Sequence, residues 1–316
     1  MSTFLTLYVL QNAKGVGPKT ISKISRQRIE SVETSQQIYE LISELASSNA
    51  KISTPTIEEI KIRLESGKKI AELHDKLSIK TISYYDDDYP DVLKEISSPP
   101  IILFARGNVA SLKMPGLAVI GTRNVSPFAQ KVGQRIGEFV AEQGLTVISG
   151  LATGCDTAGH TGCLNAGGIT VAFVATPLDK TYPKENTNLA EEIVEKNGCI
   201  VSEYPVGTPS NPYYFIQRDR LQCGLANGVI VVETGVKGGT WHAVNGCLKL
   251  GKPLGCFTFK EEHYARYPHS RGNKLLIQKF KATELCDSKS LYAFIESSCH
   301  VQPVPTATDY IQQTLF

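Results

Sequence analysis

The sequence predicts a Rossmann-like, doubly wound α/β domain with a mostly parallel sheet, preceded by a small all-helical N-terminal domain. Two observations predict this fold. From Leu117 onward, short runs of apolar residues alternate with helical segments, and apolar runs without polar alternation are typical of strands buried on both faces of a parallel sheet. Before residue 80, apolar residues recur at spacings of three or four, as they do in amphipathic helices. We expect domains at 1–80 and 81–286, followed by a short tail at 287–316.

Residues 1–80 are expected to form helices that are separated by short polar breaks. The segment around Gly15 and Gly17 resembles a helix-hairpin-helix motif, with Lys14 and Lys19 on either side of the turn. Such a turn exposes backbone amides at a helix start, where they can bind a phosphate. A second DNA contact at this turn and a plain turn between two packed helices are both open interpretations.

A linker with one or two short strands, at 79–108, leads into the α/β domain. The first strand of that domain is followed by a helix that Ser126 caps, with Pro127 in its first turn and Gly144 after its end. Further helical segments supply the crossovers that parallel strands need. The tail contains a segment at 301–310 that we expect to be extended or disordered. The expected strands are 117–121, 145–150, 169–175, 199–204, 228–234 and 253–257.

Composition argues against a disordered protein and against a membrane protein. The 316 residues are 41% hydrophobic and 20% charged, which is ordinary for a soluble globular protein. A net charge of +2 creates no global field for nucleic acid, so any basic surface must be local. We find no secretory signal and no apolar run long enough to cross a bilayer. The eight cysteines form no CxxC pair, so we expect free thiols in a reducing cytoplasm. Because no apolar run is long enough to cross a bilayer, we expect no membrane partner.

Small and polar residues follow three of the expected strands. In open parallel sheets, ligands bind beyond the carboxyl ends of the strands. Small residues let backbone amides approach an anion, and helix N-termini add partial positive charge. An arginine there suits bidentate phosphate contact. The sequence therefore predicts a phosphate-binding rim that consists of Gly121, Thr122, Arg123, Ser149, Gly150, Lys237, Gly238, Gly239 and Thr240.

Motifs for cofactors and catalysis are weak. The dinucleotide fingerprint GxGxxG is missing after the first strand, and there is no Walker A loop, so we expect no cofactor and no metal. Asp156 and His160 stand four residues apart on a helix; we favour capping for Asp156 and a packed imidazole for His160 over acid–base catalysis. Glu203 and Glu233 end two strands, where paired carboxylates could hydrolyse a glycosidic bond. A nucleotide hydrolase therefore stays open beside the preferred non-enzymatic function.

Several ordered blocks resemble the DNA-processing A family, also called DprA or Smf. Among them are LAVIGTR, VISGLATGCDTAGH, IVSEYPVGTPSNPYYFIQRDR and GVIVVETGVKGGTWHAV, within a match from about Tyr89 to Ile277. Several blocks in order are more specific than a single glycine motif. The resemblance implies a pocket at the carboxyl edge of the sheet that grips the backbone of single-stranded DNA and takes in a base.

The resemblance also implies roles for individual residues. The segment Gly121–Arg123 and the turn Gly238–Thr240 would hold phosphate, and Phe215 would stack on a base. Arg218 and Arg220 would neutralise the strand. Aromatic stacking beside cationic phosphate contacts is the physical basis of sequence-tolerant single-strand binding.

Two departures from the family pattern stand out. Asp219 places a negative charge where members usually carry asparagine, and its repulsion from phosphates could weaken DNA binding. Many members also end in a winged-helix-like domain, for which the residues after Asp287 are too few.

The expected function is single-stranded DNA binding in DNA processing and recombination, as in natural transformation. By analogy with the family, a homodimer would protect the strands and load a recombinase. One alternative is a DprA-like nucleotide- or DNA-sensing regulator, or an antitoxin, that acts with a dedicated protein partner in phage defence; Asp219 and the missing domain favour it. The other is the nucleotide glycosidic hydrolase.

Overall fold

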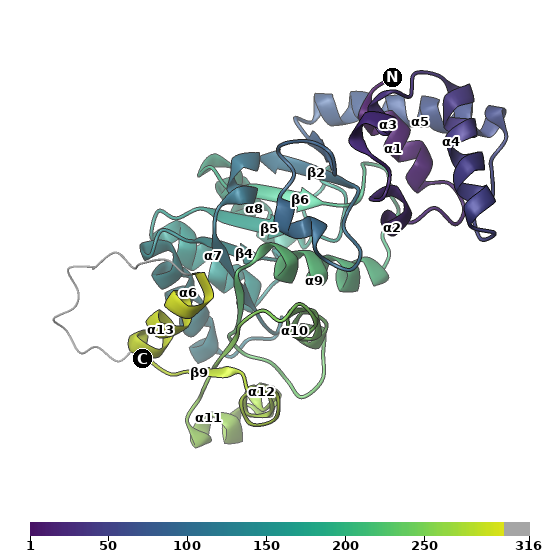
Figure 1. Ribbon diagram of the computed structural model, residues 1–316. Helices are drawn as coiled ribbons and strands as arrows, with labels where there is room; N and C mark the ends of the chain where they lie inside the picture. Colours follow the sequence, from purple (N-terminus) through teal and green to yellow (C-terminus); the bar gives the residue numbers. More distant parts are fainter. Residues whose placement is uncertain (300–316) are drawn as a thin grey trace. The chain divides into compact units, whose positions relative to one another are not determined.

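The computed structural model describes residues 1–299, which divide into two compact units that we describe separately (Figure 1). The first unit contains Met1–Arg106, Pro177–Asp179 and Ser202–Pro209. The second unit contains the remaining described residues. The extended segment expected at 301–310 lies outside the described part of the chain.

The first unit contains the predicted N-terminal helices. Two of them begin with complete capping boxes: Thr34 and Thr56 each accept a hydrogen bond from the backbone amide three residues on, and the Gln37 and Glu59 side chains bond back. These caps explain why the helices start where they do. The helices are α1 (Thr3–Gln11), α2 (Pro18–Ile21), α3 (Arg26–Glu30), α4 (Ser35–Ser48) and α5 (Ile57–Lys76), followed by β1 (Lys80–Ser83), the 3₁₀ helix η1 (Asp91–Lys94) and β2 (Ile102–Gly107).

The helices of this unit share one apolar core with the β1–β2 pair. Leu7, Leu10, Ile38 and Ile60 are fully buried in this core. Strands β1 and β2 pair antiparallel, as expected for a short hairpin-like element. The hydroxyl of Tyr85 donates to the backbone oxygen of Ile21 over 2.7 Å, which fixes the chain after β1 against the helices.

The second unit is built on parallel strands in the order β6-β5-β4-β3-β7-β8-β9. This arrangement confirms the predicted Rossmann-like, mostly parallel fold. Every residue of the six strands from β3 to β8 is buried, as the continuous apolar runs predicted. The strands are β3 (Gly116–Ile120), β4 (Thr146–Ser149), β5 (Thr170–Phe173), β6 (Cys199–Ser202), β7 (Gly228–Val231), β8 (Leu254–Phe257) and β9 (Thr283–Leu285).

Helices cover both faces of this sheet. Figure 1 shows α6, α7 and α13 on one side of the strands and α9 and α10 on the other. Helix α13 packs its Leu291, Phe294 and Ile295 into the core, although its residues belong to the segment expected as a tail. The helices are α6 (Pro127–Glu142), α7 (Cys155–Asn165), α8 (Thr187–Glu195), α9 (Tyr213–Leu225), α10 (Thr240–Lys249), α11 (Glu261–Arg266), α12 (Gly272–Phe280) and α13 (Ser288–Cys299), with short 3₁₀ turns at Val109–Lys113, Lys184–Asn186 and Pro268–Ser270. Within residues 1–299, none of the helices combines the length and apolar character needed to cross a membrane.

A buried asparagine joins the ends of two strands. Asn273, in α12, is inaccessible to solvent. Its Oδ1 accepts from the Thr234 backbone amide, and its Nδ2 donates to the backbone oxygens of Val232 and Phe257, each over 2.8 Å. Because these backbone groups lie just beyond β7 and at the end of β8, Asn273 fixes the carboxyl edge of the sheet there.

We expect Asn273→Leu to lower the free energy of unfolding by about 3 kcal/mol, because buried backbone groups lose their partners. Urea denaturation measures the change. Asn245→Leu, at an exposed position on α10, is the matched control and should shift stability by no more than about 0.5 kcal/mol. Equal stability of the two variants would contradict the role of Asn273.

Candidate nucleic-acid interface

The strand order reverses at β3. From β3 the chain proceeds outward through β4, β5 and β6, and it then returns to the other side of β3 as β7. In doubly wound sheets, the crevice at such a reversal is the usual ligand site. Two adjoining cavities open at this edge of the sheet, and both are lined only by residues of the second unit.

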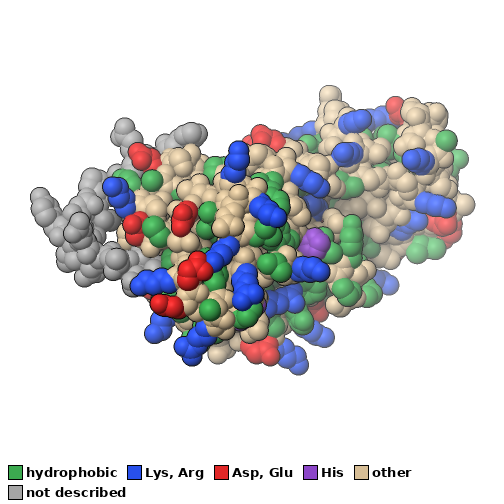
Figure 2. Space-filling model, turned by 90° about the horizontal axis from the view of Figure 1, so that it is seen from below, with side chains coloured by type: hydrophobic (Ala, Val, Ile, Leu, Met, Phe, Trp, Pro, Cys, Tyr) green, Lys and Arg blue, Asp and Glu red, His purple; other side chains and the backbone are tan. Residues whose placement is uncertain are grey.

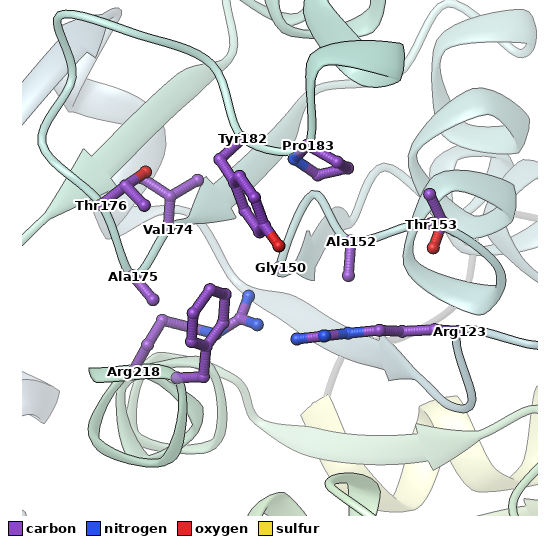
Figure 3. Close-up of a pocket in the computed structure, with 11 residues that line it drawn as sticks. Arg123, Gly150, Ala152, Thr153, Val174, Ala175, Thr176, Tyr182, Pro183 and Arg218 are labelled. Atoms are coloured by element: carbon purple, nitrogen blue, oxygen red, sulfur yellow. The ribbon is translucent and has the colours of Figure 1, made fainter. Parts of the chain in front are cut away.

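The smaller cavity, of about 70 Å³, is lined by two arginines. Figure 3 shows the guanidinium groups of Arg123 and Arg218 turned toward each other, with Tyr182 above them. The guanidinium of Arg123 also lies 5.2 Å from the ring centre of Phe215, and the Phe215 and Tyr182 rings meet edge to face. Two cations that face each other favour an anion between them, and the volume suits a small one.

Arg218 is held in place although it is charged and only 5% exposed. Its Nη1 donates to the backbone oxygen of Phe173 over 2.8 Å, and its Nε pairs with Asp219 Oδ1 over 3.1 Å. A Cβ on Gly150 would overlap the guanidinium, so only glycine fits there. The end of β5, the turn after β4 and helix α9 therefore fix one arginine together.

The larger cavity, of about 400 Å³, lies between the end of β3, α9 and the start of α10. It shares Arg123, Ala152, Phe215 and Arg218 with the smaller one. Its rim includes the predicted residues Gly121, Thr122, Lys237, Gly238, Gly239 and Thr240. At Gly238, φ is +136°, and a Cβ on Gly238 or Gly239 would meet no atom within 4 Å, so this turn is open.

Close packing fixes the turn after β3. Gly154 has φ of +84°, and a Cβ there would strike the backbone oxygens of Thr122 and Arg123. A Cβ on Gly121 would strike Cys155 and the backbone of Glu233. The backbone amide of Thr122 donates to the Glu233 oxygen over 2.7 Å, so that amide is already bonded within the protein. Glycines at positions 121 and 154 therefore let the start of α7 pack closely against the turn after β3.

Two acidic residues, Asp156 and Asp219, interact electrostatically with both arginines. Burial raises the pKa of Asp219 to about 6, while the Arg218 charge opposes that shift and the Asp156 charge adds to it. Burial likewise raises the pKa of Asp156, again against the Arg218 charge. Asp219 thus forms an ion pair with a buried arginine, where the sequence had suggested repulsion from phosphate.

His160 is a packed, neutral imidazole. It is completely buried, its Nδ1 lies 2.6 Å from Thr170 Oγ1, and burial lowers its pKa to about 3. Asp156 lies in the first turn of α7, and its Oδ2 accepts from the Ala152 backbone amide over 3.4 Å. Gly154, not Asp156, is the N-cap residue of α7. Asp156 therefore bonds to the turn that precedes the helix.

Glu233 serves as an internal anchor. Its carboxylate is fully buried and accepts from the Ser126 backbone amide over 2.7 Å and from Ser126 Oγ over 2.9 Å. His263 Nε2 lies 3.0 Å from the same carboxylate. Ser126 in turn caps α6, as predicted, by accepting from Ala129 N. Glu203, its proposed catalytic companion, belongs to a segment of the first unit.

The remaining predicted residues are distributed as follows. Ser149 is completely buried, with its hydroxyl bonded to the Val119 oxygen over 2.6 Å, and it lines neither cavity. Arg220 also lines neither cavity, and its Nη1 donates to the Gln217 oxygen. Tyr182 and Gln222 line the cavities although the sequence did not single them out.

The possible second contact lies in the first unit. Gly15 has φ of +84° and Gly17 is the N-cap of α2, while Lys14 and Lys19 are exposed. The positive φ at Gly15 explains why glycine occupies that position of the turn between α1 and α2.

Charge and metal ligands are spread thinly elsewhere. Figure 2 shows lysine and arginine side chains intermixed with acidic and apolar ones over one face of the molecule. Within residues 1–299, no group of three or more His, Cys, Asp or Glu side chains could hold a metal ion. Arg123 and Arg218 are the two arginines that line both cavities.

Fold and site together define a Rossmann-like α/β protein with two adjoining cavities at the carboxyl edge of its sheet. Residues 80–296 match the family described as DNA recombination-mediator protein A. The chain therefore belongs to this family.

Curated relatives and solved structures agree with this assignment. The chain is 38% identical to the DNA processing protein DprA of Streptococcus pneumoniae over 55% of this chain and 61% of that one. It is 36% identical to the protein Smf of Synechocystis over 53% of this chain and 43% of that one. The chain thus spans less than two thirds of the length of these relatives.

Among solved structures, DprA from Streptococcus pneumoniae matches with a TM-score of 0.67 and 26% identity, over 93% of this chain and 98% of that one. DprA from Helicobacter pylori, a protein described with a single-stranded DNA binding mode, matches with a TM-score of 0.62 and 24% identity, over 70% of this chain and 97% of that one. Because the Helicobacter pylori protein is only 24% identical to this chain, that match shows a shared fold and nothing more.

We expect Gly150→Ala to lower the free energy of unfolding by about 1–3 kcal/mol, because the new methyl group displaces the Arg218 guanidinium from its buried bonds. Thermal and urea unfolding measure this loss. Gly246→Ala in α10 is the control, since a Cβ there meets only Cys223 atoms at 3.9 Å; it should leave stability unchanged or raise it. A neutral Gly150→Ala would show that Arg218 is not fixed as described.

The raised pKa of Asp219 predicts a pH-dependent stability. As pH rises, the Asp219 carboxyl of the unfolded chain, with a pKa of 3.8, loses its proton at a lower pH than that of the folded chain, with a pKa of about 6. The folded state therefore loses stability as pH rises through this window. Asp219→Asn removes this contribution, so the unfolding free energy of the variant relative to wild type should rise by about 1–3 kcal/mol between pH 4 and pH 7.

Urea denaturation at closely spaced pH values measures this difference. Glu195→Gln, which makes the same chemical change at an exposed position on α8, reports the effect of removing one surface carboxylate. A constant difference between Asp219→Asn and wild type over the whole range would contradict the raised pKa.

Proposed function

We propose that the chain binds single-stranded DNA at the two cavities, protects the strand and hands it to a recombinase. The supporting observation is the pair of guanidinium groups, Arg123 and Arg218, that face each other (Figure 3). The Phe215 ring centre lies 5.2 Å from the Arg123 guanidinium, and the Tyr182 ring meets Phe215 edge to face. The arginines can neutralise a backbone phosphate, and an aromatic ring can stack on a base whatever its identity. Membership of the family supports the same function.

The proposal includes no catalytic step. Glu233, the carboxylate considered for glycosidic hydrolysis, already bonds to both the amide and the hydroxyl of Ser126. A carboxylate committed to a helix cap is a poor general acid or nucleophile. We further propose, on family resemblance, that the working form is a homodimer in the cytoplasm; the eight free cysteines, six of them buried, fit a reducing compartment.

The site residues proposed for DNA follow from this arrangement. Arg123 and Arg218 would contact phosphate, Phe215 would stack on a base, and the open turn from Lys237 to Thr240 would border the strand. We also propose that the turn at Gly15 and Gly17 makes a second contact with DNA.

Arg123→Ala should weaken binding of an all-thymine strand of about twelve nucleotides by about tenfold, and should reduce the slope of log affinity against log salt by about one, because one phosphate contact is lost. Fluorescence anisotropy titrations at several salt concentrations measure both quantities. Lys289→Ala, an exposed residue of α13 that lines neither cavity, is the control. Unchanged affinity and slope in Arg123→Ala would overturn the proposed site.

A further inference from the structure

The two cavities differ in what they can hold. The smaller one, about 70 Å³, has room for a phosphate-sized group, whereas the larger one, about 400 Å³, is within the range of sites for small organic ligands. Phe215 lines both. A nucleotide whose phosphate lies between Arg123 and Arg218 would therefore place its base in the larger cavity, next to the Phe215 ring.

Two polar side chains of α9 line that larger cavity. Asp219 and Gln222 are three residues apart, so they lie on the same face of the helix. Gln222 is only 2% exposed, and its side-chain Nε2 has no hydrogen-bond partner. A buried donor without a partner costs stability. Nε2 is almost inaccessible in this conformation, so it can donate to a ligand only when the Gln222 side chain turns into the cavity.

Asp219 supplies the complementary acceptor. Its side chain is 15% exposed, and Oδ1 forms an ion pair with Arg218 Nε over 3.1 Å without a hydrogen bond. A carboxylate has two oxygens with about four lone-pair sites, so one arginine contact leaves it able to accept further hydrogen bonds. At neutral pH, the cavity therefore offers the carboxylate oxygens of Asp219, and it offers an amide donor beside them once Gln222 turns toward the cavity.

One base matches this edge. Guanine carries two adjacent donors on its Watson–Crick edge, N1–H and the N2 amino group, next to the acceptor O6. Adenine and cytosine each place a ring acceptor nitrogen beside their amino group, and thymine flanks its single N–H with two carbonyl oxygens. Against a carboxylate these three bases bring an acceptor toward an acceptor, which is repulsive.

We propose that the larger cavity takes in a guanine base, with Asp219 accepting from N1–H and N2–H and Gln222 donating to O6. This inference rests on the proposed function, because the strand supplies the base. Backbone contacts by Arg123 and Arg218 stay independent of sequence. The protein thus binds strands of any sequence and prefers those that place a guanine in this cavity.

The experiment compares strands of about twelve nucleotides that are all thymine or carry one central guanine, adenine or cytosine. Wild type should bind the guanine strand about tenfold more tightly than the adenine or cytosine strand. Asp219→Asn presents one donor and one acceptor, and it should reduce the preference to about twofold or less. Gln222→Leu should weaken it as well. Fluorescence anisotropy gives the affinities, and thermal unfolding confirms that each variant is folded.

Glu195→Gln is the matched carboxyl-to-amide control and should keep the full guanine preference. Equal affinity of wild type for the guanine, adenine and cytosine strands would overturn the inference, and so would a preference that survives in Asp219→Asn. Competition with free deoxyguanosine monophosphate distinguishes a base within a strand from a free nucleotide. Competition that depends on Asp219 supports the cavity for both sources, and its absence, with the strand preference intact, restricts the cavity to strands.

Failure of this inference and failure of the proposed function have different signatures. If the all-thymine strand binds in a salt-dependent manner that Arg123→Ala weakens, but guanine brings no preference, only the base recognition is wrong. If no strand binds, the proposed function is wrong. Direct calorimetry with deoxyguanosine monophosphate then decides about the cavity: Asp219-dependent binding supports guanine recognition, and no binding overturns it.

Discussion

The buried guanidinium of Arg218 is the interaction on which the carboxyl edge of the sheet depends. It extends from α9, bonds to the end of β5 through the Phe173 oxygen, forms an ion pair with its neighbour Asp219, and passes where Gly150 has no side chain. A buried charge requires such partners, since removing any of them leaves the cation uncompensated. The same group faces Arg123 across the smaller cavity. The contacts that stabilise Arg218 therefore also orient it for its proposed ligand, so the site is formed before anything binds.

Most of the fold was predictable because burial leaves a pattern in the sequence. The apolar runs that became β3 and β4 are short and continuous, and a strand buried on both faces requires that. The expected strand ends were less accurate. The run expected at 228–234 is a strand only as far as Val231. Beyond it the backbone still bonds to the chain at the end of β3, because Val232 N donates to the Ile120 oxygen and the Glu233 oxygen accepts from Thr122 N. The Thr234 amide then bonds to the side chain of Asn273 instead of to a strand. Periodicity reports burial, and it does not report which partner a backbone group finds.

The site was predictable where topology alone places residues. Gly121, Thr122 and Arg123 follow a central strand, so they had to reach the carboxyl edge. Side-chain direction was harder: Arg218 and Arg220 are two residues apart on a helix, about 200° around its axis, and only Arg218 lines the cavities. The helical spacing of 215, 218, 219 and 222 was a signal that could have identified Gln222. Tyr182 comes from a loop, and no local pattern gives the path of a loop.

The open turn at Gly238 and Gly239 has a consequence for how tightly any long ligand can be held. No neighbouring atom would contact a side chain at either position, so packing does little to restrict the backbone there. Ordering glycines reduces conformational entropy more than ordering other residues does. A polymer that closes this turn must therefore offset that entropic penalty, which lowers affinity. In exchange, under the proposed function, the turn would adjust to sugar–phosphate backbones of different curvature, and one rigid edge would serve strands of many shapes.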